Sequence, residues 1–132
     1  MLQIVYISSA LSSVTNADVS SLLARSRTNN QRDGITGLLF FNGQRFLQAL
    51  EGPDEHVERT IAKIATDPRH RALVTLSRRT IVAREFGDWA MASFGPLDRD
   101  GKVAIARIDT LTAQASPNVR ALFTSYARLR AA

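Results

Sequence analysis

The segment GITGLLFFNGQRFLQALEG, residues 34–52, predicts a β-hairpin. Asn42 and Gly43 separate two apolar runs, and Asn-Gly is a dipeptide that two-residue hairpin turns favour. We therefore expect two antiparallel strands, near residues 35–41 and 45–51, joined by a tight turn.

Gln48 is the unusual residue of this hairpin. Side chains alternate between the two faces of a strand, so Gln48 shares its face with Phe46 and Leu50. An amide buried there without a partner would cost a few kcal/mol. Because an amide both donates and accepts hydrogen bonds, Gln48 can bridge a tyrosine hydroxyl on a neighbouring strand and a second polar group. The apolar residues around it do not supply that second group, whereas a bound polar heteroaromatic would.

The sequence on either side of the hairpin alternates between strand and helix patterns. The expected elements are a strand over residues 2–8, a helix from about 15 that fades near 28–30, a helix from 53 to about 66, and strands over 72–85 and 89–94. With the hairpin, this gives the order βαββαββ. Such an order is typical of an α+β ferredoxin-like sandwich, with two helices on one face of the sheet.

Ser116 and Pro117 predict the start of another helix, because serine is a good N-cap and proline suits the first turn. Apolar residues follow at helical spacing as far as about Arg130. Their stripe packs most simply on the free face of the sheet. We therefore divide the chain into a domain over residues 1–96 and a C-terminal helical extension over residues 97–132.

The composition is that of an ordinary globular domain of 132 residues. The absence of cysteine excludes disulfides, thiolate metal sites and a cysteine nucleophile, and we predict no metal site. The net charge of +5 comes mainly from scattered arginines, which favours a solvated surface over nucleic-acid binding. The sequence lacks a signal peptide pattern and any apolar run of membrane-spanning length, so we expect a cytoplasmic protein.

Tyr6, Asn30 and Gln48 are the polar residues whose positions invite a functional explanation. Each has a structural alternative when taken alone. A strand tyrosine is usually a packing residue whose hydroxyl reaches the edge of the core, and an asparagine tolerates the backbone of a helix C-terminus. Their combination with the surrounding motifs favours function.

Together, these motifs resemble the BLUF family of blue-light sensors that use FAD. The resemblance covers about residues 1–96. It rests on VYIS (5–8), NNQRDGITGLLFFNGQRFLQALEG (29–52), DPRHRAL (67–73) and FGDWAM (86–91), which occur in this order. The long central block is the most specific of the four. The resemblance implies a photoreceptor that is not an enzyme and binds FAD without a covalent bond, with FMN or riboflavin as alternatives.

The resemblance also implies roles for single residues. Tyr6 matches a redox-active tyrosine, and Gln48 matches the glutamine between that tyrosine and the flavin. Asn30 matches an asparagine that hydrogen-bonds the edge of the flavin ring, and Asn29 a variable position beside it. The remaining matches are the apolar residues that sandwich the ring (Leu22, Ile64), polar or basic residues near the ring and its tail (Lys63, Arg69, His70), and a signal-relay pair (Trp89, Met91).

By the same resemblance, light drives an electron and a proton from Tyr6 through Gln48, and the signal leaves by contact with a downstream protein. A homo-oligomer is also expected. Two other classes stay open on the residues alone. One is a ferredoxin-like ligand-binding or regulatory module without photochemistry. The other is a small enzyme, for which Glu51, Glu58 and the two histidines form no recognisable catalytic set.

Overall fold

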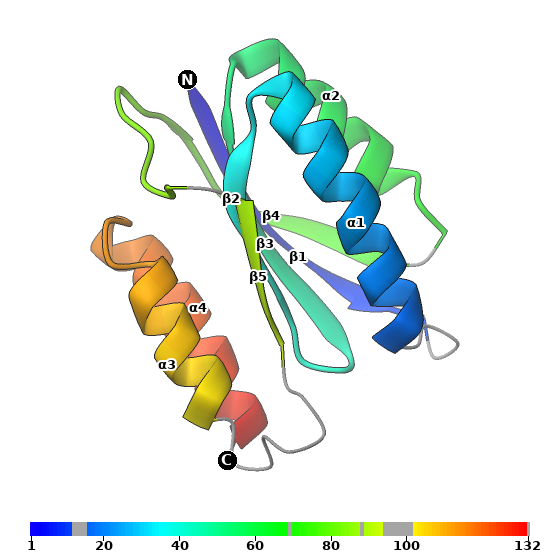
Figure 1. Cartoon of the computed structure of the whole chain (residues 1–132), viewed down its shortest axis with the longest axis vertical. Helices are drawn as coiled ribbons and strands as arrows, with labels where there is room; N and C mark the ends of the chain where they lie inside the picture. Colours follow the sequence, from blue (N-terminus) through cyan, green and yellow to red (C-terminus); the bar gives the residue numbers. More distant parts are fainter. Residues whose placement is uncertain (12–15, 69, 88, 94–101, 132) are drawn as a thin grey trace.

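A computed structural model describes residues 1–11, 16–68, 70–87, 89–93 and 102–131. Over these residues, a five-stranded sheet lies between two pairs of helices (Figure 1). The elements are β1 (Leu2–Ala10), α1 (Asn16–Asp33), β2 (Thr36–Phe41), β3 (Arg45–Gly52), α2 (Asp54–Ala65), β4 (His70–Thr80), β5 (Trp89–Ser93), α3 (Lys102–Leu111) and α4 (Pro117–Ala131). The predicted α+β fold with the order βαββαββ is confirmed.

The strands lie in the order β4-β1-β3-β2-β5. The first four are antiparallel to their neighbours, which is the ferredoxin-like arrangement, and β5 adds to the edge parallel to β2. The register of β1 and β3 sets Tyr6 opposite Gln48. Residues directly opposite each other in such a pair are close enough for their side chains to interact.

The hairpin between β2 and β3 forms as predicted. The Oδ1 atom of Asn42 accepts the backbone N–H groups of Gln44 and Arg45, at 2.9 and 2.8 Å. Gly43 adopts a φ of +94°, which glycine reaches without steric cost. The Asn-Gly pair thus fixes the register of the strand that carries Gln48.

The alternation of each strand supplies two hydrophobic cores, one on each side of the sheet. The core under α1 and α2 contains Leu2, Ile4, Ile35, Leu39, Phe41, Phe46, Leu50 and Val57. The core under α3 and α4 contains Val5, Leu38, Phe40, Leu47, Ala49, Phe86, Ile108, Val119, Phe123 and Ala127. The C-terminal helices therefore cover the second face of the sheet, as expected for α4 from the apolar stripe after Ser116 (Figure 1).

Two element ends differ most from the sequence prediction, while β1 ends and β4 starts within two residues of the predicted positions. The first helix continues to Asp33 instead of fading near residues 28–30. It ends at Gly34, whose φ of +69° lets the N–H of Ile35 bond to the carbonyl of Asn30 at 2.8 Å, the bond of a Schellman motif. The fourth strand ends at Thr80 rather than near residue 85.

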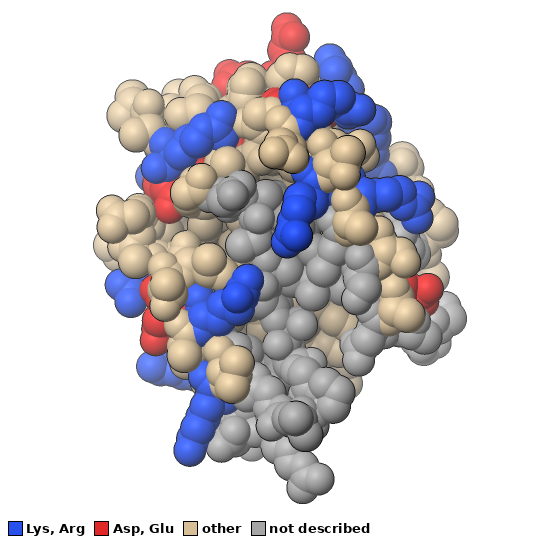
Figure 2. All heavy atoms as spheres, in the orientation of Figure 1, with Lys and Arg blue, Asp and Glu red and all other residues tan. Residues whose placement is uncertain are grey.

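The surface charge follows the sequence. On the face in Figure 2, the described Lys and Arg side chains lie at several separate places, with acidic side chains beside some of them. Among the described residues, this face has no single basic stripe. In the part of the chain that the structure describes, no helix combines the length and the apolar character that crossing a membrane requires.

Candidate functional site

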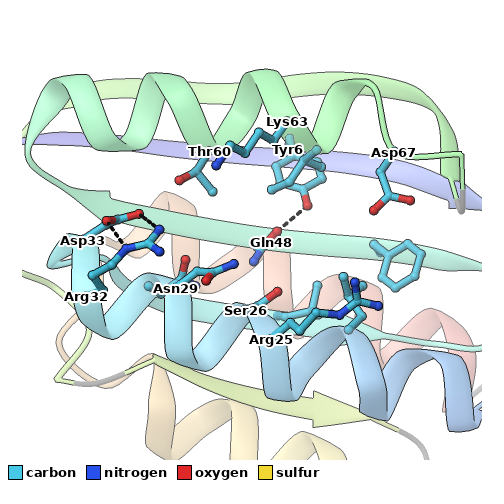
Figure 3. Close-up of a pocket in the computed structure, with 15 residues that line it drawn as sticks. Tyr6, Arg25, Ser26, Asn29, Arg32, Asp33, Gln48, Thr60, Lys63 and Asp67 are labelled. Atoms are coloured by element: carbon cyan, nitrogen blue, oxygen red, sulfur yellow. Dashed lines mark hydrogen bonds and ion pairs between the residues drawn. The ribbon is translucent and has the colours of Figure 1, made fainter.

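A cavity of about 250 Å³ lies between α1 and α2, with the sheet beneath it (Figure 3). Seven of the nine residues that the sequence assigned to a cofactor line this cavity. They are Tyr6, Leu22, Asn29, Asn30, Gln48, Lys63 and Ile64. Residues far apart in the sequence thus meet at one place.

Tyr6 and Gln48 form the centre of the cavity wall (Figure 3). Their side chains are only 2% and 5% exposed, and the Tyr6 hydroxyl donates a hydrogen bond to Oε1 of Gln48. Burial raises the pKa of the Tyr6 phenol well above its usual range, and the charge of Asp67 adds to the rise. The phenol therefore stays protonated and acts as the donor. The predicted tyrosine partner of Gln48 is confirmed.

The other end of the Gln48 amide faces the cavity. Its Nε2 atom turns away from Tyr6 towards α1 in Figure 3, and no described residue accepts a hydrogen bond from it. Asn30, only 4% exposed, reaches the cavity from the last turn of α1. The amides of Gln48, Asn30 and Asn29 therefore line the cavity with donors and acceptors, which fits a ligand with polar atoms along its edge.

Apolar side chains form the remaining walls. Leu22 of α1 and Ile64 of α2 belong to opposite helices, and Leu39 and Phe46 project from the sheet. Flat apolar walls with a few polar atoms are the usual lining of a cofactor site. The residues present therefore fit a flavin, whose flat ring would lie between the helices with its polar edge towards the amides.

Charged residues also line the cavity. Arg32 donates to both carboxylate oxygens of Asp33, at 2.9 and 3.0 Å. The hydrogen bond from Arg32 holds the pKa of the Asp33 carboxyl below its usual range. Arg25 and Lys63 add cationic donors, one from each helix. Cations of this kind suit a phosphate-bearing tail.

Sequence reasoning missed eight residues of the lining. They are Arg25, Ser26, Arg32 and Asp33 of α1, Leu39 and Phe46 of the sheet, and Thr60 and Asp67 from α2 and the segment after it. Helical spacing could have found most of them. Ser26 follows Leu22 by four positions, and Thr60 precedes Ile64 by four, so each shares a helix face with a predicted residue.

Four predicted residues lie wholly or partly outside the described part of the chain. Arg69 is not described. The backbone of His70 begins β4, and those of Trp89 and Met91 belong to β5, but their side chains lie outside the described residues. The register places Trp89 beside Gly37 and Met91 beside Leu39, which lines the cavity. The roles of these four residues remain predictions.

Comparison with known proteins identifies the family of this chain. The family described as sensors of blue light using FAD matches residues 1–92, and it is a sensor module rather than a catalytic domain. The antirepressor BluF of Escherichia coli, described as regulated by blue light and temperature, is 37% identical over 76 residues, which are 58% of this chain and 19% of BluF. The photoactivated adenylate cyclase subunit beta of Euglena gracilis is 37% identical over 70 residues, 52% of this chain and 8% of that protein.

Solved structures give the same result. BlrP1 of Klebsiella pneumoniae, in a manganese and cy-diGMP complex, superposes with a TM-score of 0.81 at 31% identity, over 96% of this chain and 33% of that one. BlrB, a BLUF protein in its dark state, superposes with a TM-score of 0.72 at 30% identity, over 96% of this chain and 94% of BlrB. The chain spans less than a fifth of the curated relatives named above. Because the family match spans residues 1–92, the chain belongs to the BLUF family of sensors of blue light using FAD.

Proposed function

We propose that this chain is a blue-light receptor that holds FAD without a covalent bond between α1 and α2. The observation that carries the proposal is the hydrogen bond from the buried Tyr6 hydroxyl to Gln48, whose other end faces the cavity. The pair joins a phenol, which can lose an electron and a proton, to an amide whose two ends differ in hydrogen-bonding character.

A bound flavin supplies the absorption of blue light and the capacity to take up an electron when excited. Tyr6 loses an electron to the excited flavin, and its hydroxyl proton passes along the existing hydrogen bond to Oε1 of Gln48. The Nε2 atom of Gln48 in turn gives up a proton towards the flavin, so the amide stays neutral. When the electron and proton return to Tyr6, no net oxidation remains. Gln48 is left rotated or in its other tautomer. Either change alters the hydrogen bonds that it offers to the cavity, and the side chain stays neutral.

The other residues assigned to the cofactor bind and orient it. Asn30 and Asn29 hydrogen-bond the ring edge, and Leu22 and Ile64 enclose its faces. Lys63, Arg69 and His70 serve the ribityl-phosphate tail. FMN and riboflavin carry the same ring, so a protein loaded with either of them keeps the same photochemistry.

The signal then passes to another protein. Relatives that are named as an antirepressor and as an adenylate cyclase subunit are much longer than the matched region, which supports an output carried by parts outside the sensor. Trp89 and Met91 relay the change through β5, and the chain acts as a homo-oligomer. A cytoplasmic location stays a prediction, which cell fractionation would test.

An absorption spectrum of the purified protein in darkness and under blue light tests the proposal. We expect a flavin spectrum that shifts slightly to the red and relaxes in darkness. A flavin spectrum without a shift, or a colourless protein that cannot be loaded with flavin, would overturn the photoreceptor and favour a ferredoxin-like binding module.

A further inference from the structure

A second polar cluster lies on the opposite face of the sheet from the cavity. We call it the polar clasp, and it consists of Gln3, Glu51, Arg79, Glu85 and Ser116. Its centre is Glu51, which is fully buried. The carboxylate of Glu51 accepts four hydrogen bonds, from Gln3 Nε2 at 3.2 Å, Thr36 Oγ1 at 3.0 Å, and the backbone N–H groups of Glu85 and Phe86 at 3.0 and 2.7 Å.

The carboxylate of Glu51 holds the connection between β4 and β5 against the sheet. Its two backbone donors both belong to this connection. Arg84, in the same connection, donates to the Gly34 carbonyl at 2.7 Å and to Thr36 Oγ1 at 2.9 Å. Residues 81–87 thus have an ordered path set by polar contacts, which is the physical reason why β4 ends earlier than the sequence predicts.

The clasp continues from the sheet to the start of α4. The Nη1 atom of Arg79 donates to Gln3 Oε1 at 2.9 Å and to Ser116 Oγ at 3.1 Å, and it lies 3.1 Å from a carboxylate oxygen of Glu85. Glu85 in turn accepts the backbone N–H of Ser116 at 2.8 Å. Ser116 caps α4 by accepting the N–H of Val119 at 3.4 Å.

The clasp and the Tyr6–Gln48 pair lie on the same two strands, β1 and β3. Gln3 lies opposite Glu51 in the register of β1 and β3, three residues along from Tyr6 opposite Gln48. Odd and even positions of a strand face opposite sides, so one pair faces the cavity and the other faces α4. In Figure 1, the connection between β4 and β5 reaches the turn between α3 and α4.

The cluster is held by directional polar contacts. No described Lys or Arg forms an ion pair with the buried Glu51 carboxylate, so its four hydrogen bonds have to offset the cost of its desolvation. Hydrogen bonds are directional, whereas apolar contacts are not. The bonds of the clasp therefore fix the N-terminus of α4 to one register of β1 and β3.

We propose that the polar clasp transmits the light-induced change from β1 and β3 to the turn between α3 and α4, as an exit route separate from Trp89 and Met91. The residues of the clasp are positioning residues, since they touch neither the cavity nor its ligand. The inference rests on the proposed photoreceptor function and names the route by which its signal leaves. The α3–α4 turn becomes the surface at which the two states differ.

The test is hydrogen exchange of the peptide spanning residues 111–123, in darkness and under blue light, with the flavin spectrum recorded on the same sample. The test variants are Arg79→Gln and Glu85→Gln. The ion pair between Arg78 and Glu58 provides the matched controls. Arg78 is next to Arg79 in the sequence, and its partner Glu58 belongs to α2, on the other face of β4. Arg78→Gln and Glu58→Gln remove a comparable charge without touching the clasp.

In the wild type and both controls, light should change the exchange of α4 in step with the red shift. In Arg79→Gln and Glu85→Gln, the red shift should stay and the light-induced change in α4 should be lost. Retention of that change in both variants would overturn the clasp as a route. A wild-type red shift without any change in α4 would overturn this inference alone, whereas the absence of a red shift would overturn the proposed function as well.

Discussion

At the scale of single residues, the proposed light response depends on the Tyr6 hydroxyl. Tyr6→Phe removes the donor to Gln48 Oε1 and leaves the cavity walls in place. We expect the variant to bind flavin and to lose the red shift. Tyr126→Phe is the matched control, because Tyr126 packs at α4 on the other face of the sheet. A full red shift in Tyr6→Phe, measured by absorption before and during illumination, would exclude the proposed role of the phenol.

The protonation of Tyr6 also links stability to pH. Burial raises the pKa of Tyr6 in the folded protein, so above the ordinary tyrosine pKa of about 10 the unfolded chain binds fewer protons than the folded one. The Tyr6 contribution is therefore full below about pH 10 and declines as the pH rises further. We expect the urea midpoint to fall more steeply between about pH 9 and about pH 11 in the wild type than in Tyr6→Phe. Parallel curves for the two proteins would contradict this.

Strand alternation predicted that Gln48 lies among buried apolar side chains and needs a polar partner, and the resemblance to the BLUF family named Tyr6 as that partner. The sequence did not predict the Arg32–Asp33 pair or the clasp around Glu51. Those contacts depend on which element ends meet in space, and a carboxyl group in the sequence does not reveal whether backbone N–H groups will surround it.

At the scale of elements, the contact between β2 and β3 depends on Gly37. A Cβ atom at this position would lie 2.0 Å from the Ala49 carbonyl oxygen, and backbone cannot move aside as a flexible side chain can. We expect Gly37→Ala to destabilise the fold by about 3 kcal/mol. Gly87→Ala is the control, since a Cβ there meets nothing within 4 Å. Urea unfolding of both variants tests this, and equal stability would show that the hairpin can adjust.

Element boundaries were harder to predict than the elements themselves. The polar end of α1 gives no apolar periodicity, so its last turn could be placed only by the backbone of Gly34. The end of β4 depends on partners from β1, β3 and α4, none of which is near it in the sequence. The hairpin was predicted closely because its signal, Asn42-Gly43, is local.

At the scale of the whole molecule, α3 and α4 complete the fold by covering the second face of the sheet. Phe123 is fully buried and lies edge-on to Phe86, with ring centroids 6.5 Å apart. We expect Phe123→Ala to lower the free energy of unfolding by about 3–5 kcal/mol. Val103→Ala on the exposed side of α3 should have little effect. Thermal unfolding measures both, and a negligible loss in Phe123→Ala would mean that the sheet does not depend on this helix layer.

The alternation of side chains along β3 leads to a prediction about the rate of recovery in darkness. Gln48 lies between Leu47 and Ala49, which belong to the core under α3 and α4, so the proposed light reaction and the proposed output helices lie on the two faces of the same strand. No hinge or domain rotation has to intervene between them. The decay of the absorption change in darkness and the return of α4 to its dark state should therefore follow one rate constant. The absorption spectrum would then report how long the signalling state lasts.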